Sequence, residues 1–392
     1  MEDLRIGVVG YGLRAPLARY AHRPGEGSRV VAVADLDEAT RARAAGELPG
    51  AVPVAGHRDL LDRADVDAVL IMSPDHTHLE IACDSLRAGK AVYAEKPLGI
   101  TVEECDTILA VARETGSRLY VGHNMRHMGF VRLMRDIIQR GEIGQVQSIW
   151  VRHFVGNGGD FYFKDWHAQR AHTTSLLLQK AAHDIDVLHW LAGGYAQRVS
   201  ALGDLRVYNR VTDRLAPGEP KRADWLDPDK HWPPLAQQGL HHDIDVEDVS
   251  LVNMVLDNGV LAAYQQCHFT PDYWRNYTVI GDAGRLENFG DTPGSVIKVW
   301  NRRRSGYRAD ADAVYEVPAA DGWHGGADPL IIEEFCRFAR SGGETDTSPV
   351  AARMSVAAGV AATASLRDGG TPRDIPALDP ELAAYYARFQ ER

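Results

Sequence analysis

The sequence predicts an α/β protein with an N-terminal Rossmann dinucleotide-binding domain and a C-terminal α+β domain containing a large open sheet, mixed or antiparallel. Three observations support this prediction. Residues 5–15 pass from a short apolar run through two glycines into a helical pattern. Strand-like and helical stretches then alternate as far as Gly122, which is typical of a parallel sheet with helices on both faces. After Phe130 most of the chain consists of short strand-like runs separated by turn residues.

A chain of 392 residues is too long for one ordinary hydrophobic core, so two domains are expected. We predict the Rossmann domain at residues 1–124 and the second domain at residues 125–392. The first turn has the features of a dinucleotide site. Gly10 permits a tight turn, Gly12 lets the backbone approach a pyrophosphate, and Ala15 lets the helix pack closely on the strand. The predicted cofactor-binding residues of this turn are Gly10, Gly12, Leu13, Arg14 and Ala15.

A second apolar run, Val30–Ala34, ends in Asp35, about 20 residues after Ala15, where the dinucleotide fingerprint places an acid. Its carboxylate can accept hydrogen bonds from the ribose hydroxyls of NAD and would repel the additional phosphate of NADP. Arg41 lies well inside the next predicted helix. NAD is therefore favoured over NADP, and the alternative is an ordinary strand–helix turn with an exposed acid.

Further polar residues follow the later strands of the first domain. We expect strands at Val66–Met72, Ala91–Ala94 and Leu119–Gly122, and helices at Asp75–Leu86 and Thr101–Glu114. Ligands of an open α/β sheet bind beyond the carboxyl ends of its strands. The residues at those ends, which we add to the cofactor site, are Ser73, Pro74, His78, Glu95, Lys96 and Asn124.

The run Glu95-Lys96-Pro97, preceded by a proline and His78 in a Pro-x-x-x-His pattern, resembles the Gfo/Idh/MocA family, named for glucose–fructose oxidoreductase and inositol dehydrogenase. The resemblance covers the first domain. It implies that Lys96 is a catalytic lysine at the nicotinamide face and that Pro97 follows a cis peptide bond. A solvated charge after a strand is the alternative for Lys96.

The second domain is predicted to begin with a helix at Phe130–Arg140 and to end with two helices. Asp257-Asn258-Gly259 between two apolar runs predicts a hairpin. The segment Ala216–Leu240 is rich in proline and charge and predicts a surface insertion. Strands are expected at Val146–Phe154, Val199–Tyr208, Val249–Leu256, Val260–Cys267, Trp274–Ile280, Arg285–Phe289 and Val296–Trp300, and closing helices at Pro329–Arg340 and Ala351–Arg367. The family resemblance implies an open sheet that pairs subunits into a homodimer or homotetramer.

A helix predicted at Thr174–Leu191 places Gln179, His183 and Asp186 on one face, with Lys180 beside His183. The His-x-x-Asp pattern again resembles the family, which implies a catalytic role for His183. The family usually has an aspartate where this chain has Gln179, and glutamine cannot act as a base. Asp186 or Lys180 could take over part of that role, and a histidine hydrogen-bonded between domains is the alternative.

Other polar residues are assigned to substrate. We predict that Gln179, Lys180, Asp186, His167, Arg170 and His324 bind it. His241, His242, Asp243 and Asp245 are spaced as metal ligands could be, but they match no zinc pattern, and no metal is predicted.

The overall charge and composition exclude several classes of partner. A net charge of −11 argues against nucleic acid and anionic membranes. We expect no apolar run to be long enough to span a bilayer, and the first strand follows the initial Met too closely for a signal peptide. Four scattered cysteines are typical of buried thiols in a reducing compartment. A cytoplasmic protein is expected.

These observations favour an NAD-dependent dehydrogenase that transfers hydride between nicotinamide and a CH–OH carbon. Lys96 would act as base if enclosure lowered its pKa from about 10.4 towards the working pH, and His183 would share or relay the proton. The resemblance implies a sugar, glycoside or cyclic polyol as substrate. Two alternatives remain: a redox-assisted glycosidase or lyase that recycles NAD in each turnover, and a non-catalytic NAD-binding ligand sensor.

Overall fold

The computed structural model describes residues 2–227 and 229–391, so one residue of the predicted insertion, residue 228, lies outside the described residues. The chain forms two compact units. The first runs to Met128 and also contains Asp321–Val356 and the chain from Ala377 onward, and the second contains Gly129–Ala320 and Ala357–Pro376. These units differ from the two continuous ranges expected, because two late segments pack on the N-terminal elements.

The first unit has a six-stranded parallel sheet in the order β3-β2-β1-β4-β5-β6. The strands are β1 (Leu4–Val9), β2 (Ser28–Ala34), β3 (Val52–Val54), β4 (Ala68–Ile71), β5 (Ala91–Glu95) and β6 (Leu119–Gly122). The chain order reverses between β1 and β4, so the loops after these two strands flank the point where dinucleotides bind in such sheets. The predicted Rossmann architecture is confirmed.

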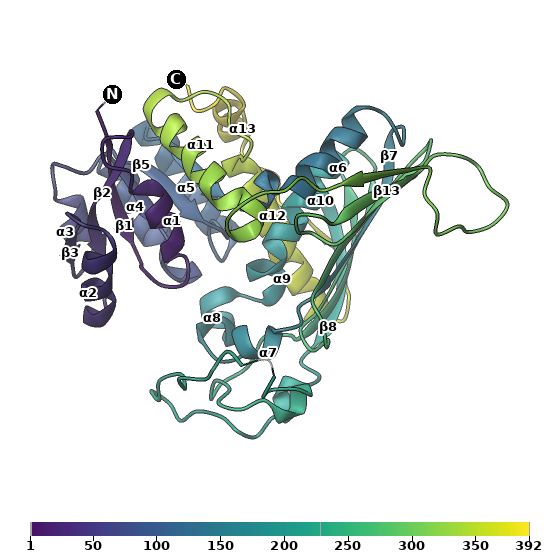
Figure 1. Ribbon diagram of the computed structural model, residues 1–392, viewed down its shortest axis with the longest axis horizontal. Helices are drawn as coiled ribbons and strands as arrows, with labels where there is room; N and C mark the ends of the chain where they lie inside the picture. The colour runs from purple at the N-terminus through teal and green to yellow at the C-terminus, as the bar shows by residue number, and fades with distance from the viewer. Residues whose placement is uncertain (1, 228, 392) are drawn as a thin grey trace. The chain divides into compact units, whose positions relative to one another are not determined.

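Helices cover this sheet. They are α1 (Ala15–Ala21), α2 (Glu38–Glu47), α3 (His57–Leu61), α4 (His78–Arg87), α5 (Val102–Thr115), α11 (Ala327–Ser341) and α13 (Pro380–Ala387), with 3-10 turns η1 (Asp75–Thr77), η2 (Asn124–His127) and η6 (Trp323–Gly326). Thr101 caps α5 by accepting from the N–H of Glu104 at 3.1 Å, and Gly116 ends it at φ 73°. Helix α11 lies beside α1 despite its distance in sequence (Figure 1).

The apolar face of α11 explains why the late segment belongs to the first unit. Ile331 and Phe335 are fully buried and join the same core as Leu17 and Tyr93. The ring of Phe335 meets that of Tyr93 edge-on, with centroids 5.6 Å apart. This packing brings the residues at the start of α11 to the Rossmann sheet.

The helix α12 (Pro349–Leu366) differs from the expectation that no apolar run is long enough to span a bilayer. Its 18 residues have a mean hydropathy of 1.2, so by length and composition it could cross a membrane. However, 78% of it is buried inside the protein, which is the burial of a core helix.

The second unit contains a nine-stranded mixed sheet in the order β14-β13-β12-β11-β7-β10-β9-β8-β15, as the predicted fold class requires. The strands are β7 (Val146–Phe154), β8 (Ala196–Asp204), β9 (Val249–Leu256), β10 (Leu261–Cys267), β11 (Trp274–Gly281), β12 (Arg285–Phe289), β13 (Val296–Trp300), β14 (Ala313–Glu316) and β15 (Arg373–Asp374). The pair β7–β10 is parallel, and the other pairs are antiparallel. The β9–β10 hairpin turns at Gly259, whose φ is 86°.

Helices α6 and α10 lie against one face of this sheet (Figure 1). The helical segments of the second unit are α6 (Gly129–Gln139), α7 (Gly158–Phe161), α8 (Arg170–Thr173), α9 (Leu176–Gln179) and α10 (Ala181–Ala192), with 3-10 turns η3 (Trp166–Ala168), η4 (Tyr208–Arg210) and η5 (Pro234–Ala236). The single helix predicted at Thr174–Leu191 is wrong in detail. Thr174 has φ 63°, Ser175 caps α9, and Lys180 separates α9 from α10.

A buried ion-pair cluster joins α10 to the covered face of the sheet. The carboxylate of Asp184 in α10 forms an ion pair with Arg275, whose Nε lies 2.9 Å away, and accepts from the Tyr277 hydroxyl at 2.7 Å. It also meets His153 Nδ1 at 2.8 Å and the Tyr264 hydroxyl at 3.0 Å. Burial tends to raise the pKa of Asp184, but the charge of Arg275 and the contact with His153 hold it below its usual value. The carboxylate is therefore ionised at neutral pH and compensates the buried guanidinium.

We predict that Asp184→Asn lowers the free energy of unfolding by about 3–5 kcal/mol at pH 7, because it leaves the Arg275 charge without its main partner. Denaturant unfolding followed by circular dichroism measures this change. The matched control is Asp204→Asn, which breaks the exposed pair with Arg206 and should cost less than about 1 kcal/mol. Equal effects of the two substitutions would contradict the importance of the buried cluster.

Candidate functional site

The turn after β1 leaves no room for a side chain at Gly10. Its φ is 85°, its N–H donates to the Ala34 carbonyl at 2.9 Å, and a Cβ there would lie 2.8 Å from the backbone nitrogen of Ser73. At Gly12, by contrast, a Cβ would meet nothing within 4 Å. Leu13 is 56% exposed and Ala15 is buried at the start of α1. The backbone at Gly12 thus borders open space, as a pyrophosphate cradle requires.

Asp35 follows β2 and lies beside the glycine turn. Its carboxylate accepts hydrogen bonds from the N–H groups of Tyr11 at 2.8 Å and Asp37 at 3.0 Å. The guanidinium of Arg41 donates to the backbone carbonyls of Asp35 and Leu36 at 2.7 and 3.0 Å. Asp35 therefore orients the turn, and the adjacent Arg41 side chain is engaged with the backbone.

Arg14 connects the glycine turn to two other segments. Its Nε donates to Glu95 at 3.0 Å, and its terminal nitrogens donate to Asp328 at 3.1 and 3.2 Å. Burial lowers the pKa of Arg14, but the charges of Glu95 and Asp328 outweigh it and raise that pKa. For Asp328, burial raises the pKa, while the hydrogen bond with His324 and the charge of Arg14 lower it to about 2. The Arg14 guanidinium and the Asp328 carboxylate are therefore charged at neutral pH.

The same network includes Asn124 and His324. The Asn124 amide donates to Asp328 at 3.1 Å, and His324 Nδ1 lies 3.0 Å from the same carboxylate. His324 has φ 53°, and positive φ values are also found at Gly322, two residues before it, and at Gly325 and Gly326 after it. The structure thus places His324 in the first unit, close to Arg14, whereas the sequence assigned it to the second domain. Asp328, which connects these residues, was not predicted.

His78 connects the loop after β5, which carries Lys96, to the loop after β4. This histidine is fully buried, with Nδ1 2.7 Å from the Pro97 carbonyl and Nε2 3.0 Å from the Ser73 carbonyl. Burial lowers its pKa, so the neutral ring bridges the loop after β4 and the loop after β5. Pro74 begins η1, and its carbonyl accepts from the Thr77 hydroxyl at 2.6 Å.

Lys96 itself follows β5 and is half-buried. The peptide bond to Pro97 is cis, as the resemblance implies. The neighbouring Glu95 is fixed by Arg14 and by the Tyr93 hydroxyl at 3.1 Å. The backbone from which the Lys96 amine extends is therefore held by a charged network on one side and by His78 on the other.

The residues of the first unit fit a dinucleotide. Gly12 borders open space, and the buried Oδ1 of Asn124 accepts no hydrogen bond from any described residue. An unsatisfied buried acceptor beyond the end of a strand is suited to a polar group of a ligand. Gly10, Gly12 and Asp35 would hold the phosphates and ribose, and Asn124 would contact the nicotinamide half.

In the second unit, Lys180 and His167 meet at a tyrosine that was not predicted. The Lys180 ammonium lies 5.7 Å from the centroid of the Tyr162 ring, and the His167 ring meets Tyr162 edge-on at 5.5 Å. His167 also stacks on Trp166 with centroids 3.8 Å apart. The sequence signal for this cluster was the concentration of aromatic residues at positions 161–163 and 166.

Two buried histidines near this cluster were also missed. Burial lowers the pKa of His153 to about 4, and its Nε2 has no hydrogen-bond partner among the described residues. His268 is fully buried, packs edge-on against Tyr162 at 5.2 Å, and likewise has both ring nitrogens unpartnered in the described chain. His153 lies near the end of β7, and His268 comes directly after β10, the parallel neighbour of β7. For His153 the signal was a histidine in alternation with the inward-facing Ile149 and Val151 of β7.

The other residues predicted in the second domain for substrate or catalysis lie on α8, α9 and α10. Arg170 pairs with Glu247 at 3.0 Å, and Glu247 also pairs with Arg367. Gln179 is buried at the end of α9. His183 is half-buried in the first turn of α10, and Asp186 is buried in the same helix.

Two groups of possible metal ligands occur among the described residues: His57, Glu80 and Asp84; and His127, Glu334 and Asp346. Arg58 donates to both carboxylates of the first group, and Glu334 in the second accepts from Tyr120 at 2.6 Å. In the sequence cluster at 241–245, His241 bonds the Asp243 carbonyl and Asp245 accepts from the Arg170 backbone. Protein donors and acceptors thus account for these groups, and we assign no metal to them.

The fold and the glycine turn together define a dinucleotide-binding protein of the Rossmann class. Residues 4–123 match the oxidoreductase family with an NAD-binding Rossmann fold, and residues 131–287 match the GFO/IDH/MocA C-terminal domain. The chain therefore belongs to the GFO/IDH/MocA oxidoreductase family.

Individual relatives agree with this membership. Inositol 2-dehydrogenase of Ralstonia nicotianae is 37% identical over 194 residues, which cover 48% of this chain and 55% of the relative. The chain thus spans about half the length of the inositol 2-dehydrogenases it matches. Myo-inositol 2-dehydrogenase of Lactobacillus plantarum has the same fold, with a TM-score of 0.71, 19% identity and coverage of 96% and 100%. Levoglucosan dehydrogenase in complex with NADH and levoglucosan gives a TM-score of 0.75 at 19% identity, again covering 96% and 100%.

We predict that Gly12→Ala weakens NADH binding at least tenfold, about 1.4 kcal/mol, while the melting temperature is unchanged, because its new methyl group meets only the space of the pyrophosphate. Nicotinamide fluorescence titration and thermal unfolding measure the two effects. Gly10→Ala is the contrasting variant and should lower the melting temperature, since its methyl group would collide with the Ser73 backbone. Unchanged NADH affinity in Gly12→Ala would exclude this turn from the cofactor site.

Proposed function

We propose that this protein is an NAD-dependent dehydrogenase that transfers hydride between nicotinamide and a hydroxyl-bearing carbon of a sugar, glycoside or cyclic polyol. The observation that carries the proposal is the placement of Lys96. Its amine extends from the carboxyl end of β5, on a loop held by Glu95, Arg14 and His78, in a domain of the NAD-binding Rossmann family. Inositol 2-dehydrogenases among the relatives support the CH–OH substrate class.

The bound cofactor would supply the hydride acceptor, and the chain's own groups would manage the proton. Lys96 would accept a hydrogen bond from the substrate hydroxyl and remove its proton as the alcohol becomes a carbonyl. His183 would share that hydroxyl or pass the proton towards solvent. The Arg14–Glu95 pair fixes Glu95, so that the strand end from which Lys96 extends is held in place.

Polar and aromatic side chains within the second unit are proposed to bind substrate. Lys180 over Tyr162, His167 beside it and the unpartnered Nε2 of His153 provide donors and acceptors next to an aromatic face. A polyhydroxylated ring matches this combination, because its hydroxyls need both donors and acceptors and its C–H faces pack on aromatic rings. Gln179, Asp186, Arg170 and His324 complete the proposed substrate set.

NAD rather than NADP is the proposed cofactor. The Asp35 carboxylate would repel a ribose phosphate, and the nearby Arg41 guanidinium is engaged with the carbonyls of Asp35 and Leu36. Neither group is arranged to bind the additional phosphate of NADP.

We also propose a homodimer or homotetramer formed through the open face of the second sheet. Several large apolar residues on β7–β10 are between about two-fifths and three-fifths exposed: Trp150, Leu202, Leu251, Val255 and Leu261. The pairing of Leu251 with Leu202 and of Leu261 with Val255 places them on one face. Contiguous exposed apolar surface of this kind marks protein interfaces. A cytoplasmic location fits the four free cysteines, three of which are buried.

A panel of inositols, sugars and glycosides incubated with NAD or NADP tests the proposed function. Absorbance of reduced nicotinamide should accumulate with NAD and at least one polyol or sugar. Product formation without net NADH would instead indicate a glycosidase or lyase that recycles NAD, and NAD binding with no turnover of any compound would indicate a ligand sensor. Either of these outcomes would contradict the dehydrogenase proposal.

For the best substrate of that panel, we predict that Lys96→Ala lowers kcat by about 10²–10⁴-fold and leaves the NADH dissociation constant nearly unchanged, because the amine acts on the substrate proton. Steady-state kinetics and fluorescence titration measure the two quantities. Lys96→Arg keeps the charge without a neutral base form and should be similarly impaired. Equal losses of turnover and of NADH affinity would show that Lys96 acts in binding.

A further inference from the structure

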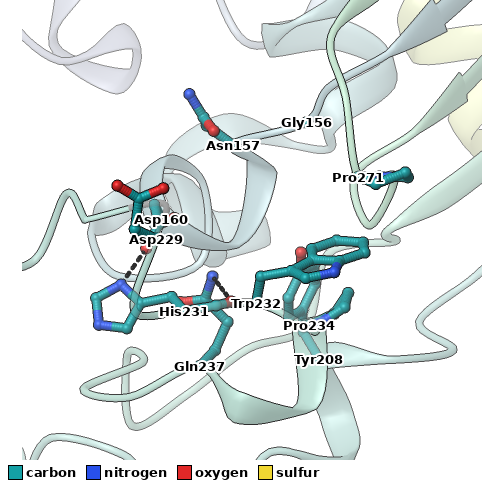
Figure 2. Close-up of a pocket in the computed structure, with 10 residues that line it drawn as sticks. All are labelled: Gly156, Asn157, Asp160, Tyr208, Asp229, His231, Trp232, Pro234, Gln237 and Pro271. Atoms are coloured by element: carbon teal, nitrogen blue, oxygen red, sulfur yellow. Dashed lines mark hydrogen bonds and ion pairs between the residues drawn. The ribbon is translucent and has the colours of Figure 1, made fainter.

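The second unit contains a cavity of about 320 Å³ that none of the proposed hydride-transfer steps uses. It is formed by the region of α7, the predicted insertion and the loop after β10 (Figure 2). Its lining residues are Gly156, Asn157, Asp160, Tyr208, Asp229, His231, Trp232, Pro234, Gln237 and Pro271. The segment Ala216–Leu240, which the sequence suggested was only a surface insertion, thus provides half of a pocket wall.

One wall of the cavity consists of a buried, charge-compensated group of polar side chains. Asp160 is 2% exposed, and its Oδ1 lies 2.6 Å from His231 Nδ1 and 2.8 Å from Lys164 Nζ. Lys164 also donates to the Trp225 carbonyl at 2.7 Å. The negative charge of Asp160 is therefore matched by Lys164 inside the protein. This wall offers hydrogen-bonding atoms without an excess charge that would need an ionic ligand.

A second polar group on the wall has an unused acceptor. Gln237 is 95% buried, and its amide nitrogen donates to the His231 carbonyl at 3.1 Å. Its Oε1 has no hydrogen-bond partner among the described residues. Buried polar atoms are nearly always satisfied in folded proteins, so an unsatisfied carbonyl oxygen in a pocket wall indicates a missing donor.

The opposite wall is aromatic and apolar. Figure 2 shows the indole of Trp232 beside Pro234 and Tyr208, with Pro271 above it. Trp232 is 46% exposed although it is among the largest apolar side chains of the insertion. The Tyr208 hydroxyl donates to the His268 carbonyl at 2.7 Å, so its ring rather than its hydroxyl is available to the cavity. A flat apolar surface therefore faces the polar wall.

We propose that this cavity binds one neutral saccharide ring, separate from the carbon that is oxidised. A sugar ring has apolar C–H faces that stack on an indole and a rim of hydroxyls that both donate and accept hydrogen bonds. At about 320 Å³ the cavity lies at the lower end of the volume range of small-molecule pockets, which suits a single sugar ring. The Gln237 Oε1 and the Asp160–His231 pair would bind its hydroxyls, and Trp232 would stack on its face.

The compensated charge also decides against other ligands. A charged sugar of either sign would lose hydration here without gaining a strong new partner, because Asp160 and Lys164 already pair with each other and the exposed Asp229 is screened by solvent. This proposal does not depend on hydride transfer, since it concerns equilibrium binding in the second unit alone.

Saturation-transfer NMR and calorimetry on the full chain, without nicotinamide cofactor, test the proposal. The probes are methyl glucoside, methyl galactoside and methyl mannoside, with glucuronate and glucosamine as charged comparisons. We expect at least one neutral glycoside to bind more tightly than both charged sugars. Trp232→Ala should weaken that binding at least tenfold, and Trp232→Phe should restore most of it.

The matched control is Leu235→Ala, which removes an equally exposed apolar side chain from the same insertion without lining the cavity. It should leave the affinity unchanged. Asn157→Ala, on the exposed side of the pocket wall, provides a second test if Trp232→Ala reduces the melting temperature, and should also weaken binding. Equal binding by wild type and both pocket variants, tighter binding of a charged sugar, or no binding of any neutral glycoside would each overturn the proposal.

Discussion

The contact between the turn after β1 and the end of β4 is the constraint on which the cofactor site depends. Gly10 approaches the backbone of Ser73 so closely that a side chain would lie within 3 Å of it. Hydrogen bonds from Gly10 to the Ala34 carbonyl and from Tyr11 to Asp35 attach the same turn to β2. The loop is therefore fixed by its neighbours before any ligand binds, and its next glycine borders open space. Such preorganisation reduces the entropy that a bound dinucleotide must lose.

The ion pairs around Arg14 extend this rigid region to the proposed catalytic loop. A guanidinium between two buried carboxylates is expensive to desolvate, and the network is favourable only because each charge has partners on two sides. Through it, the glycine turn, the strand before Lys96 and the first turn of α11 form one charged unit. On the opposite side of the Lys96 loop, the two ring nitrogens of His78 lie 2.7 Å from the Pro97 carbonyl and 3.0 Å from the Ser73 carbonyl. The position of Lys96 is thus determined by residues that need not contact substrate.

Local sequence signals predicted the elements and the turn, but not the partners that bring them together. The glycine spacing, the Thr101 cap and the Asp257-Asn258-Gly259 hairpin each act within a few residues, and all three are present in the structure. Asp328 lies 314 positions from Arg14, so no periodicity connects them.

Long-range packing also explains the remaining differences. Asp184 interacts across the sheet with residues of three strands, and a helix pattern cannot reveal that its side chain enters the core. The backbone of Thr174, with a positive φ in a residue that rarely adopts it, interrupted a helix that its apolar neighbours favoured. The insertion looked like solvent-exposed loop because its proline and charge content hides the cavity that it encloses.

The central claim is that the turn and Asp35 form an NAD site in the first unit, and parallel equilibrium titrations of the unmodified protein with NADH and with NADPH test it most directly. The arrangement predicts saturable NADH binding and an NADPH affinity at least tenfold lower, because the ribose phosphate would face the Asp35 carboxylate. Tighter binding of NADPH, or no binding of either dinucleotide, would contradict the account.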